Sequence, residues 1–172
     1  MDLEGFNRAA DSDLAQALAA CADVPRWVAA LSDGRPYASV PVLLARADAL
    51  ARGWSDAEVD RALAQHPRIG ERAAGGGTEA AASAREQSGV AGDERTKARL
   101  RAGNEAYESR FDRVFLIRAA GRSEREILAA LDARLANDPE TERGVVASEL
   151  REIAVLRLER LVTSPPTEGA QR

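Results

Sequence analysis

The chain contains one histidine, His66, in the segment Gln65-His66-Pro67-Arg68-Ile69-Gly70-Glu71. Histidine is the side chain best suited to exchange a proton near neutral pH, which makes His66 the first candidate for general acid–base chemistry. Pro67 disfavours the α conformation at His66, so the helix before it should end there and leave the imidazole on a loop. Catalytic side chains are concentrated on loops of this kind. A lone histidine is more often a surface or core residue, and its place beside Pro67 favours the catalytic interpretation.

A second group of polar residues falls on a helix predicted over 78–88. Ser83, Glu86 and Gln87 are spaced i, i+3 and i+4, so they share one face of that helix. The face is either a solvated polar stripe or a pocket wall of hydrogen-bonding groups. Glu86 also falls in the last turn, where the helix dipole disfavours a carboxylate, and this placement suits an acid–base or hydrogen-bonding role.

Arg157 interrupts the apolar stripe of the last predicted helix. A step of about 100° per residue places it near the middle of that stripe, between Ile153 and Leu161, with Arg160 at the edge. An arginine on a buried face is costly unless it is paired or bound to an anion. Arg157 therefore either pairs internally or holds a substrate carboxylate, which a guanidinium matches with two parallel hydrogen bonds.

Other kinds of catalytic centre are poorly supported. A zinc site would lack a second histidine, and the loop from Gly70 to Gly77 lacks the Gly-Lys-Ser/Thr ending that cradles phosphates. The single cysteine, Cys21, is far from His66 in sequence and is best interpreted as a small buried residue. If the protein is an enzyme, we expect acid–base and electrostatic catalysis with no cofactor and no metal.

The elements that must position these residues are predicted to be helices. Ala, Leu, Arg and Glu are abundant in the 172 residues, whereas runs of β-branched residues are nearly absent. We expect a single bundle-like all-α domain over 1–162 and a disordered tail over 163–172. The helices are predicted at 12–22, 24–32, 40–52, 55–65, 78–88, 92–119, 123–136 and 140–162.

Local signals set these limits. Three capping boxes are predicted, at Asp13 with Gln16, Ser55 with Glu58, and Ser123 with Glu126. Pro25 and Pro41 suit helix starts. Glycines just past helical runs are predicted to end them, at Gly34, Gly53, Gly89 and Gly121. The apolar run from Phe111 to Ala120 fits a buried strand equally well by periodicity, but a lone strand would lack a partner, so a helix is predicted.

Charge and hydropathy exclude several partners. The net charge of −4 offers no basic stripe for nucleic acid, and no apolar run approaches the roughly 20 residues that cross a bilayer. The N-terminus lacks the layout of a signal peptide, and one cysteine suits a reducing compartment, so a cytoplasmic location is expected. A small anionic ligand stays compatible with this charge.

Several motifs, in order along the chain, resemble the OHCU decarboxylase family, where OHCU is 2-oxo-4-hydroxy-4-carboxy-5-ureidoimidazoline. The His-Pro-x-Ile-Gly motif at His66 is followed by a Ser-x-x-Glu-Gln helix at Ser83, and the two are specific in combination. The other matching segments are Gly103-Asn104-Glu105-Ala106-Tyr107-Glu108, Phe115-Leu116-Ile117, Gly121-Arg122-Ser123, Asn137-Asp138 and Leu156-Arg157-Leu158. The sequence departs from the family at Asp112, where Gly is common, and at Arg118, where a small residue or Cys is frequent.

The resemblance implies an all-α, cofactor-free enzyme, commonly a homodimer, that converts OHCU to (S)-allantoin and carbon dioxide in urate degradation. His66 and Glu86 would be catalytic, with His66 the proton carrier, and Arg157 would orient the substrate's anionic end. The other substrate-binding residues implied are Pro67, Ser83, Gln87, Phe115, Leu116 and Ile117. The alternative is a non-catalytic helical module that binds a small anionic purine-derived ligand or a partner helix.

Overall fold

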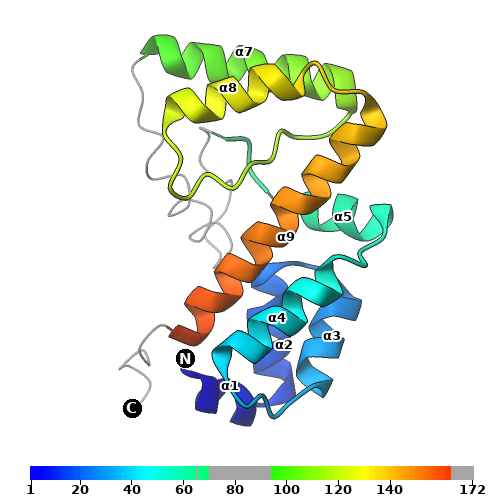
Figure 1. The fold of residues 1–172 in the computed structure, drawn as a ribbon, viewed down its shortest axis with the longest axis vertical. Helices are drawn as coiled ribbons and strands as arrows, with labels where there is room; N and C mark the ends of the chain where they lie inside the picture. Colours follow the sequence, from blue (N-terminus) through cyan, green and yellow to red (C-terminus); the bar gives the residue numbers. More distant parts are fainter. Residues whose placement is uncertain (65, 70–93, 164–172) are drawn as a thin grey trace. The chain divides into compact units, whose positions relative to one another are not determined.

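The computed structural model describes residues 1–64, 66–69 and 94–163, and every regular element in these ranges is a helix (Figure 1). The all-α fold class is thereby confirmed. In chain order the helices are α1 (Leu3–Arg8), α2 (Asp11–Cys21), α3 (Pro25–Asp33), α4 (Val40–Ala51), α5 (Asp56–Leu63), α7 (Glu94–Phe111), α8 (Glu124–Arg134) and α9 (Pro139–Thr163). None of these helices is long and apolar enough to cross a membrane.

Helix starts follow local capping in most places. The capping boxes predicted at Ser55 and Ser123 are both formed, each serine bonding the third residue of its helix and being bonded in return. The box predicted at Asp13 is wrong, because α2 begins two residues earlier, after Ala10, and Asp13 lies in its first turn. Helix α1 was not predicted; Asp2 caps it by accepting the N–H of Gly5 at 2.7 Å.

The helix predicted over 92–119 is too long. Helix α7 ends at Phe111, where Asp112 adopts the left-handed conformation with φ 53° and donates its N–H to the Glu108 carbonyl. Residues 114–119 have no regular structure, so a helix there is wrong. Gly121 consequently ends no helix; its φ of 80° serves the turn before Ser123.

The chain divides into two compact units, and helix α9 contributes to both. The first unit contains Met1–Trp54 and the chain from Arg151 onward. Its core is built on side chains that are at most 1% exposed, Phe6, Leu14, Leu18, Trp27, Leu31 and Leu43. Trp27 also donates its indole N–H to the Ala47 carbonyl at 3.0 Å, which ties α3 to α4.

The second unit contains Ser55–Leu150. Within it α7 and α8 lie side by side (Figure 1), and an apolar cluster joins them to the irregular segment 114–119. Gly103 permits the close approach of the two helices, because a Cβ at this position would lie 2.3 Å from Leu131 Cδ2. The loop predicted over 73–77, the helix predicted over 78–88 and the tail after Thr163 lie outside the described residues.

Candidate active site

His66 lies directly beyond the C-terminal end of α5. Its backbone N–H donates to the Leu63 carbonyl at 2.9 Å, and its imidazole Nδ1 lies 3.0 Å from the Ala62 carbonyl oxygen. A carbonyl oxygen accepts hydrogen bonds only, so Nδ1 must carry the proton in this contact. In the neutral ring Nε2 is then the basic nitrogen. The side chain is 7% exposed. Helix α5 thus fixes both the position and the tautomer of the candidate proton carrier.

Helix α7 holds the loop that carries His66. Asn104, itself 1% exposed, donates its amide to the Ile69 carbonyl at 3.1 Å. One turn further along α7, Glu108 accepts two hydrogen bonds from Arg68, at 2.6 Å from Nε and 2.5 Å from Nη2. A planar guanidinium paired with a carboxylate in this way restricts orientation as well as distance. The loop between Pro67 and Ile69 is therefore anchored to α7 at both Arg68 and Ile69.

Phe115 and Ile117 belong to the same buried apolar cluster as Ile69, and Leu116 between them is also buried. The three residues are 1–5% exposed, and because their side chains are apolar, any hydrogen bond that the segment offers a ligand must come from its backbone. The Leu116 carbonyl accepts a 2.6 Å hydrogen bond from Arg134 Nη1. Because the C=O and N–H of a trans peptide point in opposite directions, the N–H of Ile117 is turned away from Arg134.

The next peptide of this segment is fixed from helix α9. The backbone N–H of Arg118 donates to Glu149 Oε2 at 2.7 Å, which turns the Ile117 carbonyl away from Glu149. The Arg118 side chain donates to the Ala120 carbonyl at 3.2 Å. Arg118, which is larger than the small residue or Cys frequent at this position in the family, is thus accommodated while its backbone N–H stays bound to Glu149.

Sequence reasoning did not identify a buried polar cluster behind this segment. Arg134 donates to Glu142 Oε1 from both Nε, at 2.8 Å, and Nη2, at 2.6 Å. The hydroxyl of Tyr107 donates to the same carboxylate, and the Asn137 amide donates to its other oxygen at 2.8 Å. Burial, followed by the hydrogen bond to Glu142, raises the pKa of Tyr107 well above its ordinary range, so the hydroxyl stays protonated and donates.

The signal for this cluster was present in the helical pattern. Ile127, Leu131 and Arg134 follow the spacing i, i+4, i+7 and form the buried stripe of α8. This is the same interruption of an apolar stripe that singled out Arg157.

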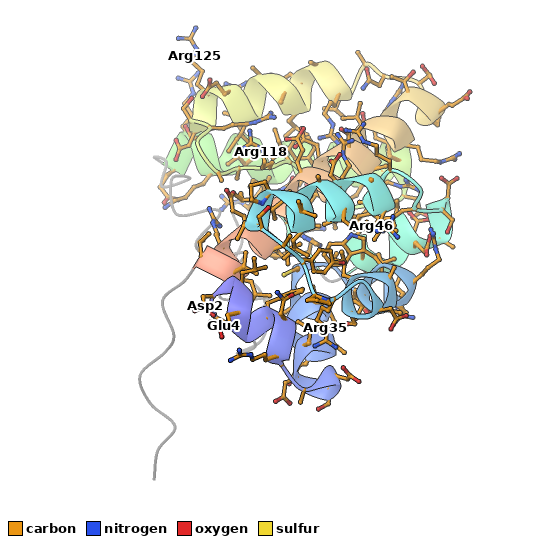
Figure 2. The ribbon with its side chains drawn as sticks, turned by 60° about the horizontal axis from the view of Figure 1, so that its bottom comes forward. Asp2, Glu4, Arg35, Arg46, Arg118 and Arg125 are labelled. Carbon is orange, nitrogen blue, oxygen red and sulfur yellow. The ribbon has the colours of Figure 1, made fainter. Side chains whose placement is uncertain are left out.

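On the same helix Arg125 is exposed and extends into solvent (Figure 2).

Arg157 belongs to the first unit. It lies on α9, is 4% exposed as its place in the apolar stripe predicts, and donates from Nη1 to the Ala20 carbonyl at 3.4 Å. Arg160 is exposed. Of the two arginines, Arg157 is therefore the one that the fold buries.

The remaining predicted site residues divide into two groups. Pro67 is described and half-buried beside His66, in the second unit. Ser83, Glu86 and Gln87 lie outside the described residues. The structure thus brings the His66 loop together with Phe115 and Ile117 through the cluster that contains Ile69. The catalytic and binding roles assigned from sequence stay predictions.

Fold and contacts together define an all-helical protein with a tautomer-fixed histidine and an arginine-anchored backbone segment. The family model for OHCU decarboxylase matches residues 7–159. The 2-oxo-4-hydroxy-4-carboxy-5-ureidoimidazoline decarboxylase of Amia calva is 32% identical over 149 residues, which cover 83% of each chain. The chain belongs to the OHCU decarboxylase family.

Two solved structures share the fold. A crystal structure of OHCU decarboxylase in the presence of (S)-allantoin is similar with a TM-score of 0.71 and 24% identity, covering 84% of this chain and 95% of that one. A crystal structure of (S)-allantoin synthase is similar with a TM-score of 0.68 and 18% identity, covering 92% of this chain. This chain spans 53% of the latter protein.

Proposed function

We propose that this protein is a cofactor-independent carboxy-lyase that converts OHCU to (S)-allantoin and carbon dioxide in urate degradation. The observation that carries the proposal is the family match over residues 7–159, which contains every residue assigned to the site. The fixed tautomer of His66 supports it independently, because the histidine is held as a proton-exchanging group should be.

The chemistry of the substrate explains how such a reaction proceeds without an electron-accepting cofactor. The carboxylate of OHCU sits on a ring carbon next to a C=N bond. When the carbon–carboxylate bond breaks, its electron pair forms a bond to the neighbouring ring carbon, and the C=N pair moves onto nitrogen. The nitrogen takes up a proton, and a second proton adds to one face of that neighbouring carbon while the hydroxyl group loses its proton and becomes a ring carbonyl. The face to which the carbon is protonated sets the handedness of allantoin. The protein needs to orient the carboxylate, exclude water and deliver a proton to one face.

His66 is the proton carrier in this proposal. Because Nδ1 is committed to the Ala62 carbonyl, Nε2 is the nitrogen that exchanges the proton with the substrate. The loop contacts of Asn104 and Glu108 would hold that nitrogen in register during turnover. A positioned general acid or base contributes about 10²–10⁴-fold in rate.

The other roles follow from the chemistry of each side chain. Arg157 orients the substrate carboxylate, and Glu86 bonds the substituents of the hydroxyl-bearing carbon. Backbone groups of Phe115–Ile117 complete the cradle, where the anchored peptides fix the direction of the Ile117 N–H. Ser83 and Gln87 bind the ureido or ring amide groups of the substrate, and Pro67 shapes the wall of the pocket.

We further propose that the protein acts as a homodimer in the cytoplasm. The family resemblance supports the dimer. Cys21, the only cysteine in the sequence, is buried and has no second cysteine in the chain to form a disulfide with, which suits a reducing compartment.

Substitution of His66 by asparagine tests the proposed chemistry. An asparagine amide can still donate to the Ala62 carbonyl from the position of Nδ1, but it has no group at the position of Nε2. We expect decarboxylation to fall by about 10²–10⁴-fold with the melting temperature nearly unchanged. Ultraviolet absorbance and optical rotation report the reaction when OHCU is generated from urate by urate oxidase and hydroxyisourate hydrolase.

Arg125→Gln is the matched control, because it removes an exposed polar side chain of α8 that has no part in the site. It should keep the wild-type rate. Near-normal turnover by His66→Asn would refute the role of His66. Failure of the wild type to exceed the spontaneous rate would refute the enzyme and leave the non-catalytic ligand-binding module.

A further inference from the structure

The geometry points to a role for the buried Arg134–Glu142 ion pair beyond stability: we propose that it positions the backbone of Phe115–Ile117 for the substrate. The inference rests on the proposed function, which assigns this segment to substrate binding. Arg134 touches no reacting atom in this scheme and acts as a positioning residue through the Leu116 carbonyl.

The guanidinium of Arg134 binds a carboxylate on one side and a backbone carbonyl on the other. Its Nε and Nη2 face Glu142, while Nη1 donates to the Leu116 carbonyl at 2.6 Å. Its plane also lies over the Phe115 ring, with Cζ 4.7 Å from the ring centroid. One rigid group therefore fixes a main-chain oxygen and an adjacent side chain of the same segment, which a flexible ammonium could not do.

The acceptor side of the pair is equally constrained. Glu142 is 1% exposed and receives hydrogen bonds from Arg134, Tyr107 and Asn137, so its carboxylate cannot rotate without losing a buried bond. The Tyr107 ring, whose hydroxyl is one of these donors, packs edge-on against Phe115 at 5.2 Å between centroids. The segment is thus held by a closed set of contacts from α7, α8 and α9.

Stability alone is a weak reason for such a cluster. Replacing a buried ion pair by well-packed apolar side chains is often neutral or stabilising, because both charges must be desolvated. The arrangement is explained instead by what it fixes. With Arg134 setting the peptide before Ile117 and Glu149 setting the peptide after it, both backbone polar groups of Ile117 have defined directions.

Arg134→Lys separates positioning from charge. The lysine keeps a cation opposite Glu142, but one ammonium cannot reproduce the fork that reaches both Glu142 and the Leu116 carbonyl. A shift of about 1 Å at a binding group costs on the order of 10²-fold, so we expect kcat/KM for OHCU to fall by about that factor. Binding of (S)-allantoin should weaken, and the amide of Ile117 should exchange hydrogen faster than in the wild type.

Two further variants complete the test. Leu43→Ala creates a cavity in the first unit and lowers the melting temperature without touching this cluster; its kcat/KM per folded molecule should stay near wild type. Tyr107→Phe keeps the ring against Phe115 and removes the hydroxyl, so it should show a smaller change in the same direction. This milder variant carries the test if Arg134→Lys does not fold.

The outcomes separate the two proposals. A folded Arg134→Lys with wild-type kcat/KM and wild-type allantoin affinity overturns the positioning role. So does a loss of activity that merely tracks the loss of stability, as measured against Leu43→Ala. An inactive wild type overturns the proposed function instead, and faster exchange of the Ile117 amide in Arg134→Lys would then still show that Arg134 fixes the segment.

Discussion

Replacing Asp112 by glycine should stabilise the protein. Asp112 is exposed, lies one residue beyond the end of α7 and has a φ of 53°. Its N–H still donates to the Glu108 carbonyl at 2.9 Å, and its left-handed conformation then turns the following chain out of the helix toward Phe115–Ile117. Glycine adopts the conformation without steric cost, which is why it is the usual residue at this position of a helix end.

The size of the effect comes from opposing contributions. An L-residue in the left-handed region costs roughly 1–2 kcal/mol, and aspartate relieves part of this through local hydrogen bonding. Glycine also increases the conformational freedom of the unfolded chain, which lowers the free energy of unfolding of the variant by about 0.5–1 kcal/mol. Removing a carboxylate from the negative end of the helix dipole adds about 0.3–1 kcal/mol of stabilisation. We expect a net gain of about 0.5–1 kcal/mol, or a rise in melting temperature of roughly 1–4 °C.

Urea and thermal unfolding of three variants test this reasoning. Asp112→Gly should be more stable than wild type, while Asp112→Ala should be less stable by up to about 1 kcal/mol because alanine tolerates the left-handed region poorly. Asp112→Asn keeps the tolerance and removes only the charge, so it should lie between wild type and glycine. If the alanine variant proved as stable as the glycine variant, the left-handed conformation of Asp112 would not be the source of the gain.

Two other expectations concern pH and assembly. Hydrogen bonds from Ser123 lower the pKa of Glu126, and those from Thr141 lower the pKa of Asp138, below their ordinary values of 4.5 and 3.8. Their stabilising contributions are complete above about pH 5 and decline as the pH falls through the folded pKa values. The urea midpoint of the double variant Glu126→Gln/Asp138→Asn should therefore depend less on pH between about 5 and 3 than that of the wild type. An unchanged pH dependence would count against the stabilising role of both carboxylates. In sedimentation equilibrium the 18.4 kDa chain should give twice its mass, and a monomer would refute the proposed homodimer.

The elements that could be predicted from sequence are those with local causes. The capping boxes at Ser55 and Ser123 depend on four consecutive residues, so their helix starts are recognisable without tertiary information. The box at Asp13 failed because a helix start also needs the preceding residues to leave the helix, and here the chain leaves it only at Ala10. Helix α1 was missed because six residues offer too little periodicity to detect.

The segment after α7 could not be predicted because its conformation is imposed from outside. Phe115, Leu116 and Ile117 are buried consecutively, which neither helical nor alternating periodicity describes. Their backbone polar groups are satisfied partly by side chains of α8 and α9, Arg134 and Glu149, rather than by a regular ladder. Only the tertiary fold brings these partners together, so the sequence pattern alone could not distinguish this segment from a helix.

The contrast between local and tertiary causes also applies to the two buried arginines, of which Arg157 was identified from the sequence and Arg134 was not. Both interrupt the apolar stripe of a helix, so the pattern that singled out Arg157 is equally present around Arg134. The partner of Arg134, Glu142, lies in the first turn of the next helix, where an acidic residue already has a local explanation through the helix dipole. Its burial at 1% exposure shows that the tertiary contact dominates.

The motif Gly103-Asn104-x-x-Tyr107-Glu108 illustrates how a family signature arises from positioning rather than from chemistry. Gly103 lets α8 pack closely against α7. Asn104 and Glu108 hold the His66 loop, and Tyr107 donates a hydrogen bond to Glu142 in the buried polar cluster. Four residues within two turns of one helix thus serve the histidine loop and the anchored backbone segment together. A change in this helix would displace both, so a reaction that needs a proton delivered to one face should be sensitive to residues that never touch the substrate.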